Sequence, residues 1–505
     1  MSPPFDEPAA PAHEPAAPAH EPAAPAHEPG AAGGPWPPAD LPRTLEELRD
    51  SGWRSSPVAE ELRRNASARI AQGRPVVEGV VGFDETVVPQ LENALLAGHD
   101  MMLLGERGQA KTRLIRALVT LLDEWLPIVA GSEINDDPFH PTSRFARLRL
   151  AEEGDATPVA WVHRSDRYGE KLATPDTSIA DLIGEVDPIK VAEGRYLSDE
   201  LTVHYGLVPR VNRGIFAINE LPDLAERIQV GLLNVLEERD VQIRGHRVRL
   251  PLDVVLVATA NPEDYTNRGR IITPLKDRFG AQIRTHYPRD AATEVAVVRA
   301  EAKVPSDGVP VVVPDYLVEV VAEISQLARR SPHLNQRSGV SVRLSIANFE
   351  TLVASARRRA LRIGEPDAVP RVSDLPALVS STQGKVEVEA LEEGREEEVI
   401  AQLVRAAVLA VFRRRVVLPD AAGVVADFEA GRVVHTGDDL PSSDYLAVLG
   451  DVPGLEAPAR ALAGSDGESP ALLAAGIEFV LEGLHLTKRL NKQTSGGRAS
   501  YRARR

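Results

Sequence analysis

The chain has 505 residues, 43% of them hydrophobic, and a formal net charge of −16 at pH 7. This length predicts two or three domains, and the acidic balance argues against a generally nucleic-acid-binding surface, although a local basic channel is compatible with it. Cysteine is absent, which excludes disulfides, thiolate zinc sites and cysteine nucleophiles. The sequence shows neither a secretory signal nor an apolar run approaching the roughly 20 residues that cross a bilayer, so we expect a soluble cytoplasmic protein without a membrane span.

Residues 1–40 are a low-complexity arm. The repeat Glu-Pro-Ala-Ala-Pro-Ala-His occurs three times and is followed by a Gly- and Pro-rich stretch. Proline at this density removes backbone donors and favours extended chain, so we expect disorder. The evenly spaced His13, His20 and His27 could chelate a metal, but their recurrence with the repeat explains them more simply.

Residues 41–75 have the apolar spacing of helices. Thr44-Leu-Glu-Glu47 resembles a capping box, and Val58 to Ile70 reads as an amphipathic helix. An apolar stretch, Val76 to Phe83, follows and leads into another predicted helix from Glu85 to Leu96. We treat residues 41–75 as an N-terminal helical segment.

The next stretch has the layout of a phosphate-binding loop. An apolar run, Met101 to Leu104, predicts a buried strand, and Arg113 to Leu122 has apolar residues at helical spacing. Between them, Gly105-Glu-Arg-Gly-Gln-Ala-Lys-Thr112 matches a P-loop, whose N–H groups and helix N-terminus would hold a triphosphate. Lys111 would reach the terminal phosphates, and the Thr112 hydroxyl would bind Mg²⁺. A chance match beside an ordinary helix is the alternative, which the flanking strand and helix disfavour.

We predict that the nucleotide contacts this loop and an upstream turn. A Val-Val-Gly turn just before a P-loop often packs on an adenine ring, although alone it would be read as a buried turn. The predicted nucleotide-binding residues are Val80, Val81, Gly82, Gly105, Glu106, Arg107, Gly108, Gln109, Ala110, Lys111, Thr112 and Arg113.

Ala110 departs from the P-loop pattern, which has glycine just before the lysine. A Cβ is tolerable there if the residue already has helical dihedral angles, because only a positive φ demands glycine. Gly105 and Gly108, in the loop proper, are retained.

Residues 214–220, Gly-Ile-Phe-Ala-Ile-Asn-Glu, predict an apolar strand that ends in a polar pair. In a P-loop NTPase this is the Walker B position, where a first acid positions Mg²⁺ and a second polarises the attacking water. Glu220 fills the second role. Asn219 places a neutral amide in the first, which can accept a hydrogen bond from metal-bound water but adds no negative charge. An ordinary strand end is the alternative.

Three further polar residues follow along the chain. Asn261 ends the apolar run Val254 to Ala260, where a side chain beside the phosphates can orient water. Arg278 lies on a short exposed element, where the simplest interpretation is a surface charge paired with Asp277. Arg343 begins a helical run within residues 291–365 and could return to the nucleotide.

The remaining segments suggest partner contacts and an accessory region. An insertion runs from about Asp181 to Pro209, and Val241 to Leu250 predicts a hairpin turning at Gly245-His246. After Pro366, a long charged helix (Val386 to Arg415), an acidic loop-rich stretch and a second helix (Leu472 to Leu490) precede a basic tail. We interpret that tail as a solvated end.

Taken together, these elements resemble the AAA+ ATPases, most closely the MoxR-like group and the I subunit of magnesium chelatase. The resemblance covers roughly residues 76–365, and Ala110 looks like a MoxR-type variant. The stretches that carry it are Gly105 to Thr112, Asp181-Leu-Ile-Gly184, Arg213 to Glu220, Leu236-Glu-Glu-Arg239, Ala258-Thr-Ala-Asn-Pro262 and Leu275 to Gly280.

The resemblance implies an α/β fold, with a parallel-sheet P-loop core at residues 76–290, a helical lid at 291–365 and a mostly helical accessory region at 366–505. It also implies ATP and Mg²⁺ as cofactors, with Thr112 and Asn219 on the metal side. The catalytic roles it implies are a base (Glu220), a sensor that aligns water (Asn261), an arginine finger acting on the neighbouring subunit (Arg278) and a second sensor on the lid (Arg343).

An arginine acting in trans makes hydrolysis depend on assembly, so we expect a ring, a hexamer by this likeness. Such rings act on a protein partner, often one with a von Willebrand A-type domain, which the insertion and the hairpin would face. Magnesium insertion into a porphyrin is an alternative, as is a hydrolysis-poor nucleotide-dependent scaffold marked by Asn219. An enhancer-binding activator ranks lower, because we find no GAFTGA loop and no helix-turn-helix.

Overall fold

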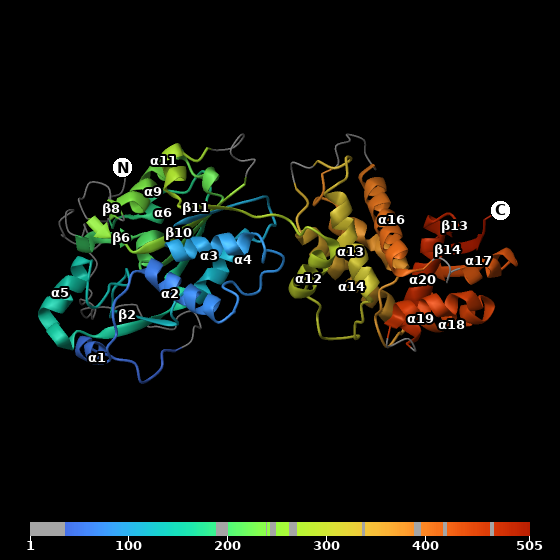
Figure 1. The fold of residues 1–505 in the computed structure, drawn as a ribbon, viewed down its shortest axis with the longest axis horizontal. Coiled ribbons are helices and arrows are strands. Elements are labelled where there is room, and N and C mark those ends of the chain that lie inside the picture. The colour runs from blue at the N-terminus through green and yellow to red at the C-terminus, as the bar shows by residue number, and fades with distance from the viewer. Residues whose placement is uncertain are drawn as a thin grey trace, which may run out of the picture. The chain divides into compact units, whose positions relative to one another are not determined.

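The protein is described by a computed structural model (Figure 1). The residues it describes are 36–187, 200–238, 240–242, 249–261, 270–335, 339–387, 395–417, 422–464 and 469–504. They form two compact units, one of residues up to 53 together with 125–163, and the other of 54–124 together with 164–505. The arm expected to be disordered lies almost entirely outside the described residues. In the part of the chain described, no helix is both long and apolar enough to cross a membrane.

The smaller unit is built on an antiparallel ribbon of β2 (Trp125–Val129) and β3 (Val159–His163), with α1 (Leu45–Asp50) and α5 (Arg144–Glu153). Thr44 caps α1 by accepting a hydrogen bond from the Glu47 amide (3.3 Å). The fully buried Asp136 carboxylate accepts hydrogen bonds from the Thr142 amide (2.7 Å) and the Ser143 amide (2.8 Å), which fixes the loop after β2.

The larger unit contains a five-stranded, fully parallel sheet with the order β11-β1-β10-β7-β4. Every residue of β1, β7 and β10 is buried, as continuous apolar runs in a parallel sheet predict. The strands are β1 (Met101–Leu104), β4 (Tyr168–Leu172), β7 (Gly214–Asn219), β10 (Val254–Ala260) and β11 (Ala281–Arg284). Parallel pairing brings their carboxyl ends to one edge, where ligands bind in open α/β sheets.

Helices α2 (Val58–Ala71), α3 (Val87–Ala97) and α4 (Lys111–Leu118) share one hydrophobic cluster with β1. Leu62, Leu91 and Leu114 are among its buried members. A buried ion pair ties α2 to the sheet region, because Arg167 donates to both Glu61 carboxylate oxygens (2.8 and 2.6 Å). The P-loop helix is thereby anchored on its apolar face.

Short elements follow the sheet strands. The predicted insertion contains an antiparallel pair, β5 with β6, and the predicted hairpin is seen as β8 with β9, although its turn and residues 188–199 lie outside the described residues. These elements are η3 (Arg164–Arg167), α6 (Ile179–Leu182), β5 (Gly184–Val186), η4 (Glu200–Thr202), β6 (Val203–Tyr205), α8 (Leu207–Arg210), η5 (Leu221–Asp223), α9 (Glu226–Glu238), β8 (Asp240–Gln242), β9 (Arg249–Pro251) and α11 (Thr273–Arg278).

From residue 291 onward the chain is mainly helical. Residues on both sides of the predicted boundary at 365/366, such as Leu317, Val353, Phe412 and Phe479, are buried in one shared cluster. The helices are α12 (Ala291–Glu301), α13 (Asp315–Ala328), α14 (Arg343–Ile363), η7 (Val372–Ala377), α15 (Leu378–Thr382), α16 (Arg395–Arg415), α17 (Ala422–Glu429), α18 (Ser442–Asp451), η8 (Pro453–Leu455), α19 (Glu456–Ala463) and α20 (Pro470–Leu486).

The arginines of the basic tail, Arg498, Arg502 and Arg504, are exposed as expected of a solvated end, but the backbone that carries the first two is an ordered strand. Residues 498–503 form β14 (Arg498–Ala503), the middle strand of a sheet with β12 (Val434–Gly437) and β13 (Leu490–Ser495). The backbone is held because Tyr501 is buried against the helical cluster, while the exposed Arg498 pairs with Asp439. Alternation of arginine with small and aromatic residues is the strand signal that charge counting concealed.

Candidate functional site

The P-loop connects β1 to α4, which begins at Lys111. Its N-cap residue, Ala110, has φ 54° and ψ 18°, in the left-handed region. Ala110 therefore does not have the helical dihedral angles that would leave alanine free of strain. A residue with a Cβ in the left-handed region costs roughly 1–2 kcal/mol. Gly105 and Gly108 are required for space, since an added Cβ would overlap Thr285 and Gln109 at the first position and Ser341 at the second.

Lys111 is buried within the loop it follows. Its Nζ donates hydrogen bonds to the carbonyl oxygens of Gly105 and Glu106, the latter at 3.0 Å. This holds the ammonium group at the mouth of the loop, where P-loop lysines meet phosphate oxygens.

A residue that the sequence did not single out, Thr285, holds the far side of the loop. Its Oγ1 donates to the Gln109 side chain (2.8 Å), and its amide donates to the Leu104 carbonyl (2.8 Å). Thr285 directly follows β11, and only the pairing of β11 with β1 brings it there. No local motif could have revealed it.

Asn219, at the end of β7, contacts the hydroxyl of a P-loop threonine and that of a threonine in β10. Its Oδ1 accepts from Thr112 Oγ1 (3.5 Å) and Thr259 Oγ1 (3.4 Å). The next residue, Glu220, has a φ of 56° and donates its amide to Thr259 Oγ1 (2.9 Å). Thus the structure brings Thr112, Asn219 and Glu220 together, as the sequence predicted.

The amide nitrogen of Asn219 faces a carboxylate that the sequence analysis missed. Asn219 Nδ2 donates to Glu170 Oε1 at 2.6 Å, from the neighbouring strand β4. The other oxygen, Oε2, accepts from Arg116 Nε and from the Tyr168 hydroxyl, both at 2.9 Å. Burial raises the pKa of Glu170, but the hydrogen bonds from Arg116 and Tyr168 outweigh it, so its pKa lies below the ordinary value and the group is ionised at neutral pH.

Asn261, which directly follows β10, carries a buried acceptor. Its Oδ1 has no hydrogen-bond partner in the described part of the chain. Buried polar atoms are normally paired, so an unpaired acceptor beside a phosphate loop fits a side chain that aligns water or phosphate.

Arg113 links the upstream turn to α4. Its Nε donates to the Gly79 carbonyl (2.7 Å), and its guanidinium pairs with Glu301 on α12. In the turn itself, Gly82 has a φ of 86°, and Val81 is 37% exposed. The turn therefore offers an apolar side chain to a ligand.

The two predicted arginines occupy exposed helix ends. Arg278 is the last residue of α11, and Arg343 is the first residue of α14. Ser341, two residues before Arg343, lies against Gly108 of the P-loop. This brings the start of α14 to the nucleotide loop.

The donor atoms of this site fit Mg·ATP. The Thr112 hydroxyl and the Asn219 amide oxygen are hard oxygen donors of the kind that Mg²⁺ prefers. The residues described contain no group of three or more His, Cys, Asp or Glu side chains able to hold a metal by themselves. Substrate phosphates and water would therefore complete the coordination, as is usual for Mg²⁺.

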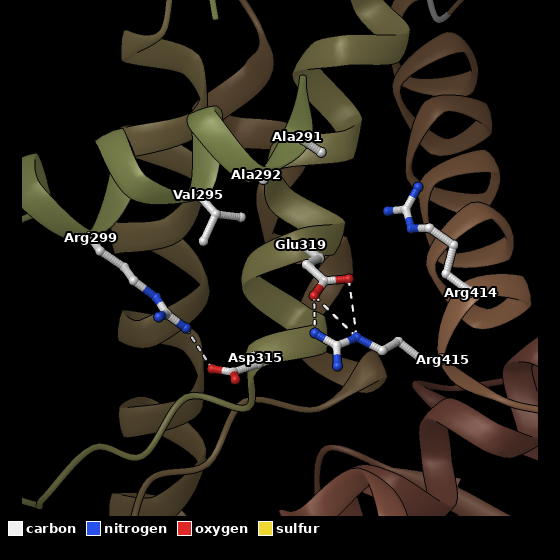
Figure 2. A pocket seen from close by; sticks show the side chains of 8 residues that line it. All are labelled: Ala291, Ala292, Val295, Arg299, Asp315, Glu319, Arg414 and Arg415. Carbon is white, nitrogen blue, oxygen red and sulfur yellow. Dashed lines mark hydrogen bonds and ion pairs between the residues drawn. The ribbon is translucent and has the colours of Figure 1, made fainter. Parts of the chain in front are cut away.

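A separate cavity of about 490 Å³ lies among α12, α13 and α16 and contains none of the predicted site residues (Figure 2). The charged side chains that line it all form ion pairs. Arg299 pairs with Asp315 (2.5 Å) and Arg415 pairs with Glu319. Arg414 pairs with Glu323 (2.9 Å), which does not line the cavity. It offers no uncompensated charge to a phosphate.

Comparison with known proteins agrees with this geometry. Residues 192–278 match the family described as the sigma-54 interaction domain. The chloroplastic magnesium-chelatase subunit ChlI-1 of Arabidopsis thaliana is 29% identical over 242 residues, which are 46% of this chain and 54% of that protein. The magnesium-chelatase 38 kDa subunit of Cereibacter sphaeroides is 30% identical over 210 residues, which are 39% of this chain and 54% of that protein.

The chain thus spans about half the length of these curated relatives. An alignment with a chain from a reconstruction of the complex between subunits BchI and BchD of magnesium chelatase covers 65% of this chain and 100% of that chain, with 22% identity and a TM-score of 0.34. The sequence likenesses, together with a P-loop at the carboxyl edge of a parallel five-stranded sheet, relate the chain to the AAA+ ATPases and, among them, to the I subunits of magnesium chelatase.

Proposed function

We propose that the chain binds Mg·ATP at the P-loop, hydrolyses it, and works as a ring on a protein partner, in the manner of a MoxR-like remodelling ATPase. One observation carries the proposal. Thr112 of the P-loop contacts Asn219 (3.5 Å), and the parallel pairing of β1, β10 and β7 brings the residues that follow these strands, Glu220 and Asn261 among them, to the same carboxyl edge of the sheet.

Each of these residues has a role that its position supports. Lys111 and the loop amides hold the phosphates, and Glu220 accepts a proton from the attacking water. Asn261 orients that water through Oδ1, which has no hydrogen-bond partner among the described residues. Thr112 and Asn219 would hold Mg²⁺, which would supply positive charge to offset that of the phosphates.

The assembly belongs to the same proposal. Arg278, exposed at the end of α11, would act on the nucleotide of the neighbouring subunit, and Arg343 would sense the nucleotide from the start of α14. A hexamer in the cytoplasm and a partner with a von Willebrand A-type domain are what the resemblance predicts. A role as the ATPase subunit of a complex that inserts a metal into a tetrapyrrole, which the relatives' names suggest, is compatible with the same nucleotide site.

Asn219 favours a second candidate, a nucleotide-dependent scaffold with little turnover. A neutral amide at this position lacks the charge of the usual acid. If Asn219→Asp raised a very low wild-type turnover severalfold, the scaffold would be the better description.

The direct test measures binding of a fluorescent ATP analogue and release of phosphate. Lys111→Ala should abolish binding or turnover, because the loop loses its only ammonium group. Glu220→Gln should bind ATP with near-normal affinity yet lose turnover by about 10²–10³-fold, since only the water-activating carboxylate is removed.

Matched controls are Lys303→Ala and Glu226→Gln, which make the same changes at exposed positions away from the loop. Both should behave as wild type. Normal hydrolysis by Glu220→Gln would show that the base is misplaced, and a wild-type protein that never binds nucleotide would end the proposal.

A further inference from the structure

Asn219 can serve a metal site only if its oxygen, and not its nitrogen, faces Thr112. The side-chain amide of asparagine is nearly symmetric in shape, so its orientation is decided by hydrogen-bond partners. Here Nδ2 donates to Glu170 Oε1 at 2.6 Å, which leaves Oδ1 toward Thr112 Oγ1 at 3.5 Å. The carboxylate therefore fixes the amide in the orientation that a metal site needs.

Glu170 also carries the charge that Asn219 lacks. A hydrogen bond to an ionised acceptor is shorter and stronger than a neutral one, and it polarises the group that donates it. Polarisation of the amide by Glu170 increases the partial negative charge on Asn219 Oδ1. Thus a carboxylate on the neighbouring strand β4 contacts the amide that stands where P-loop enzymes place the acid of the Walker B strand.

A surface ion pair is the simpler explanation of Glu170, because Arg116 Nε lies 2.9 Å from Oε2. However, the Arg116 side chain is 64% exposed, and pairs with such exposure stabilise proteins little. Asn219 uses the other oxygen, so the two contacts are separable by mutation.

We propose that Glu170 is a positioning residue of the magnesium site, acting through Asn219 as the displaced Walker B acid. The inference rests on the proposed function, because it presupposes that Mg·ATP binds at Thr112. It predicts that affinity for the metal, rather than for the nucleotide alone, depends on Glu170.

The experiment titrates Mg²⁺ into protein with a fluorescent ATP analogue and compares binding with that in EDTA. Glu170→Gln should bind the analogue in EDTA as wild type does, which also shows that the variant is folded. Its half-saturating Mg²⁺ concentration should rise about tenfold or more, the usual effect of losing an outer-shell partner of a metal site.

Two further variants decide the mechanism. The exchange variant Glu170→Gln with Asn219→Asp returns a carboxylate to the Walker B position and should restore a wild-type Mg²⁺ requirement. Arg116→Gln removes the ion pair but keeps the carboxylate, so it should not raise that requirement. Glu226→Gln, an exposed acid on α9, controls for the lost charge.

A wild-type Mg²⁺ requirement in Glu170→Gln would overturn the inference, as would an exchange variant no better than the single variant. An equal rise in Arg116→Gln would also overturn it in favour of the ion pair. In each case the wild-type protein still binds Mg·ATP, so the proposed function survives. Failure of wild type to bind nucleotide would instead remove the proposed function itself.

Discussion

Two residues of the proposed site, Ala110 and Glu220, have positive φ angles although neither is glycine (54° and 56°). Such strain persists only where the surroundings hold it, and it concentrates at functional sites. For Glu220 the holding contact is visible, because its amide donates to Thr259 Oγ1 at 2.9 Å. For Ala110 it is the start of α4, whose Leu114 amide donates to the Ala110 carbonyl at 2.9 Å.

The Ala110 strain makes a prediction about local stability. Ala110→Gly relieves a cost of roughly 1–2 kcal/mol but adds chain entropy to the unfolded state, so α4 should gain about 0.5–1 kcal/mol. Amide hydrogen exchange over residues 105–118 should slow by about two- to fivefold. In the control, Ala68→Gly at an exposed position within α2, exchange should accelerate, because glycine weakens a helix interior. Faster exchange in Ala110→Gly would contradict the strain argument.

At the scale of elements, the fully buried strands β1, β7 and β10 were predictable from the sequence, whereas β4, at one edge of the sheet, was not. Met101–Leu104 was predicted with its observed bounds, because a strand buried on both faces is written as one apolar run. β4 reads Tyr-Gly-Glu-Lys-Leu and is only partly buried at the edge of the described sheet, so nothing in its sequence indicated a strand. Glu170 and Thr285 were missed for the same reason, since each reaches the site only through strand pairing.

A buried polar network across α14, η7, α18 and α20 predicts a pH dependence. Glu365 pairs with Arg359 (2.9 Å) and Arg371 (2.8 Å), while the fully buried Glu478 accepts from the Ser373 amide (2.8 Å) and the Tyr445 hydroxyl (2.5 Å). Burial raises the pKa of Glu365, but the Ser442 hydrogen bond and both arginines outweigh it, so the net shift is downward. Burial raises the pKa of Glu478 and dominates there.

The two shifts have opposite consequences for stability. The contribution of Glu365 is present above the ordinary carboxyl pKa of about 4.3 and is lost as pH falls through its lowered value. The contribution of Glu478 is present below that ordinary pKa and is lost as pH rises through its raised value. The free energy of unfolding of Glu365→Gln should therefore approach that of wild type as pH falls. The free energy of unfolding of Glu478→Gln should increase relative to wild type as pH rises. Melting temperatures measured against pH check this, and parallel pH slopes for the two variants would contradict it.

At the scale of the whole molecule, the lid is not an independent core. Leu317 and Val353 of the predicted lid share one hydrophobic cluster with Phe412 and Phe479 of the accessory region. Residues 366–504 therefore support the helices that follow the P-loop core. The sequence placed a boundary at residue 365 because proline and a change in charge pattern mark it, while packing across that boundary involves side chains far apart in the chain.

The assembled ring gives the last prediction. If Arg278 completes the site of a neighbouring subunit, Lys111→Ala and Arg278→Ala proteins should each be inactive alone but active when mixed. A Lys111→Ala subunit still offers its arginine, and an Arg278→Ala subunit still offers its P-loop. In a random equal mixture, an intact P-loop faces an intact Arg278 at about a quarter of the interfaces, because each is present on half of the subunits. Roughly a quarter of wild-type turnover should therefore return if one complete interface suffices.

The control pair, Lys111→Ala mixed with Arg362→Ala, separates this recovery from simple dilution, because Arg362 is exposed in the last turn of α14 and has no role in the proposed site. Arg362→Ala should be fully active alone, and mixing should lower its activity only as far as inactive subunits replace active ones. Mixtures of the two site variants that stay inactive under conditions where subunits exchange would confine Arg278 to its own subunit. The proposed dependence of hydrolysis on ring assembly would then need another physical cause.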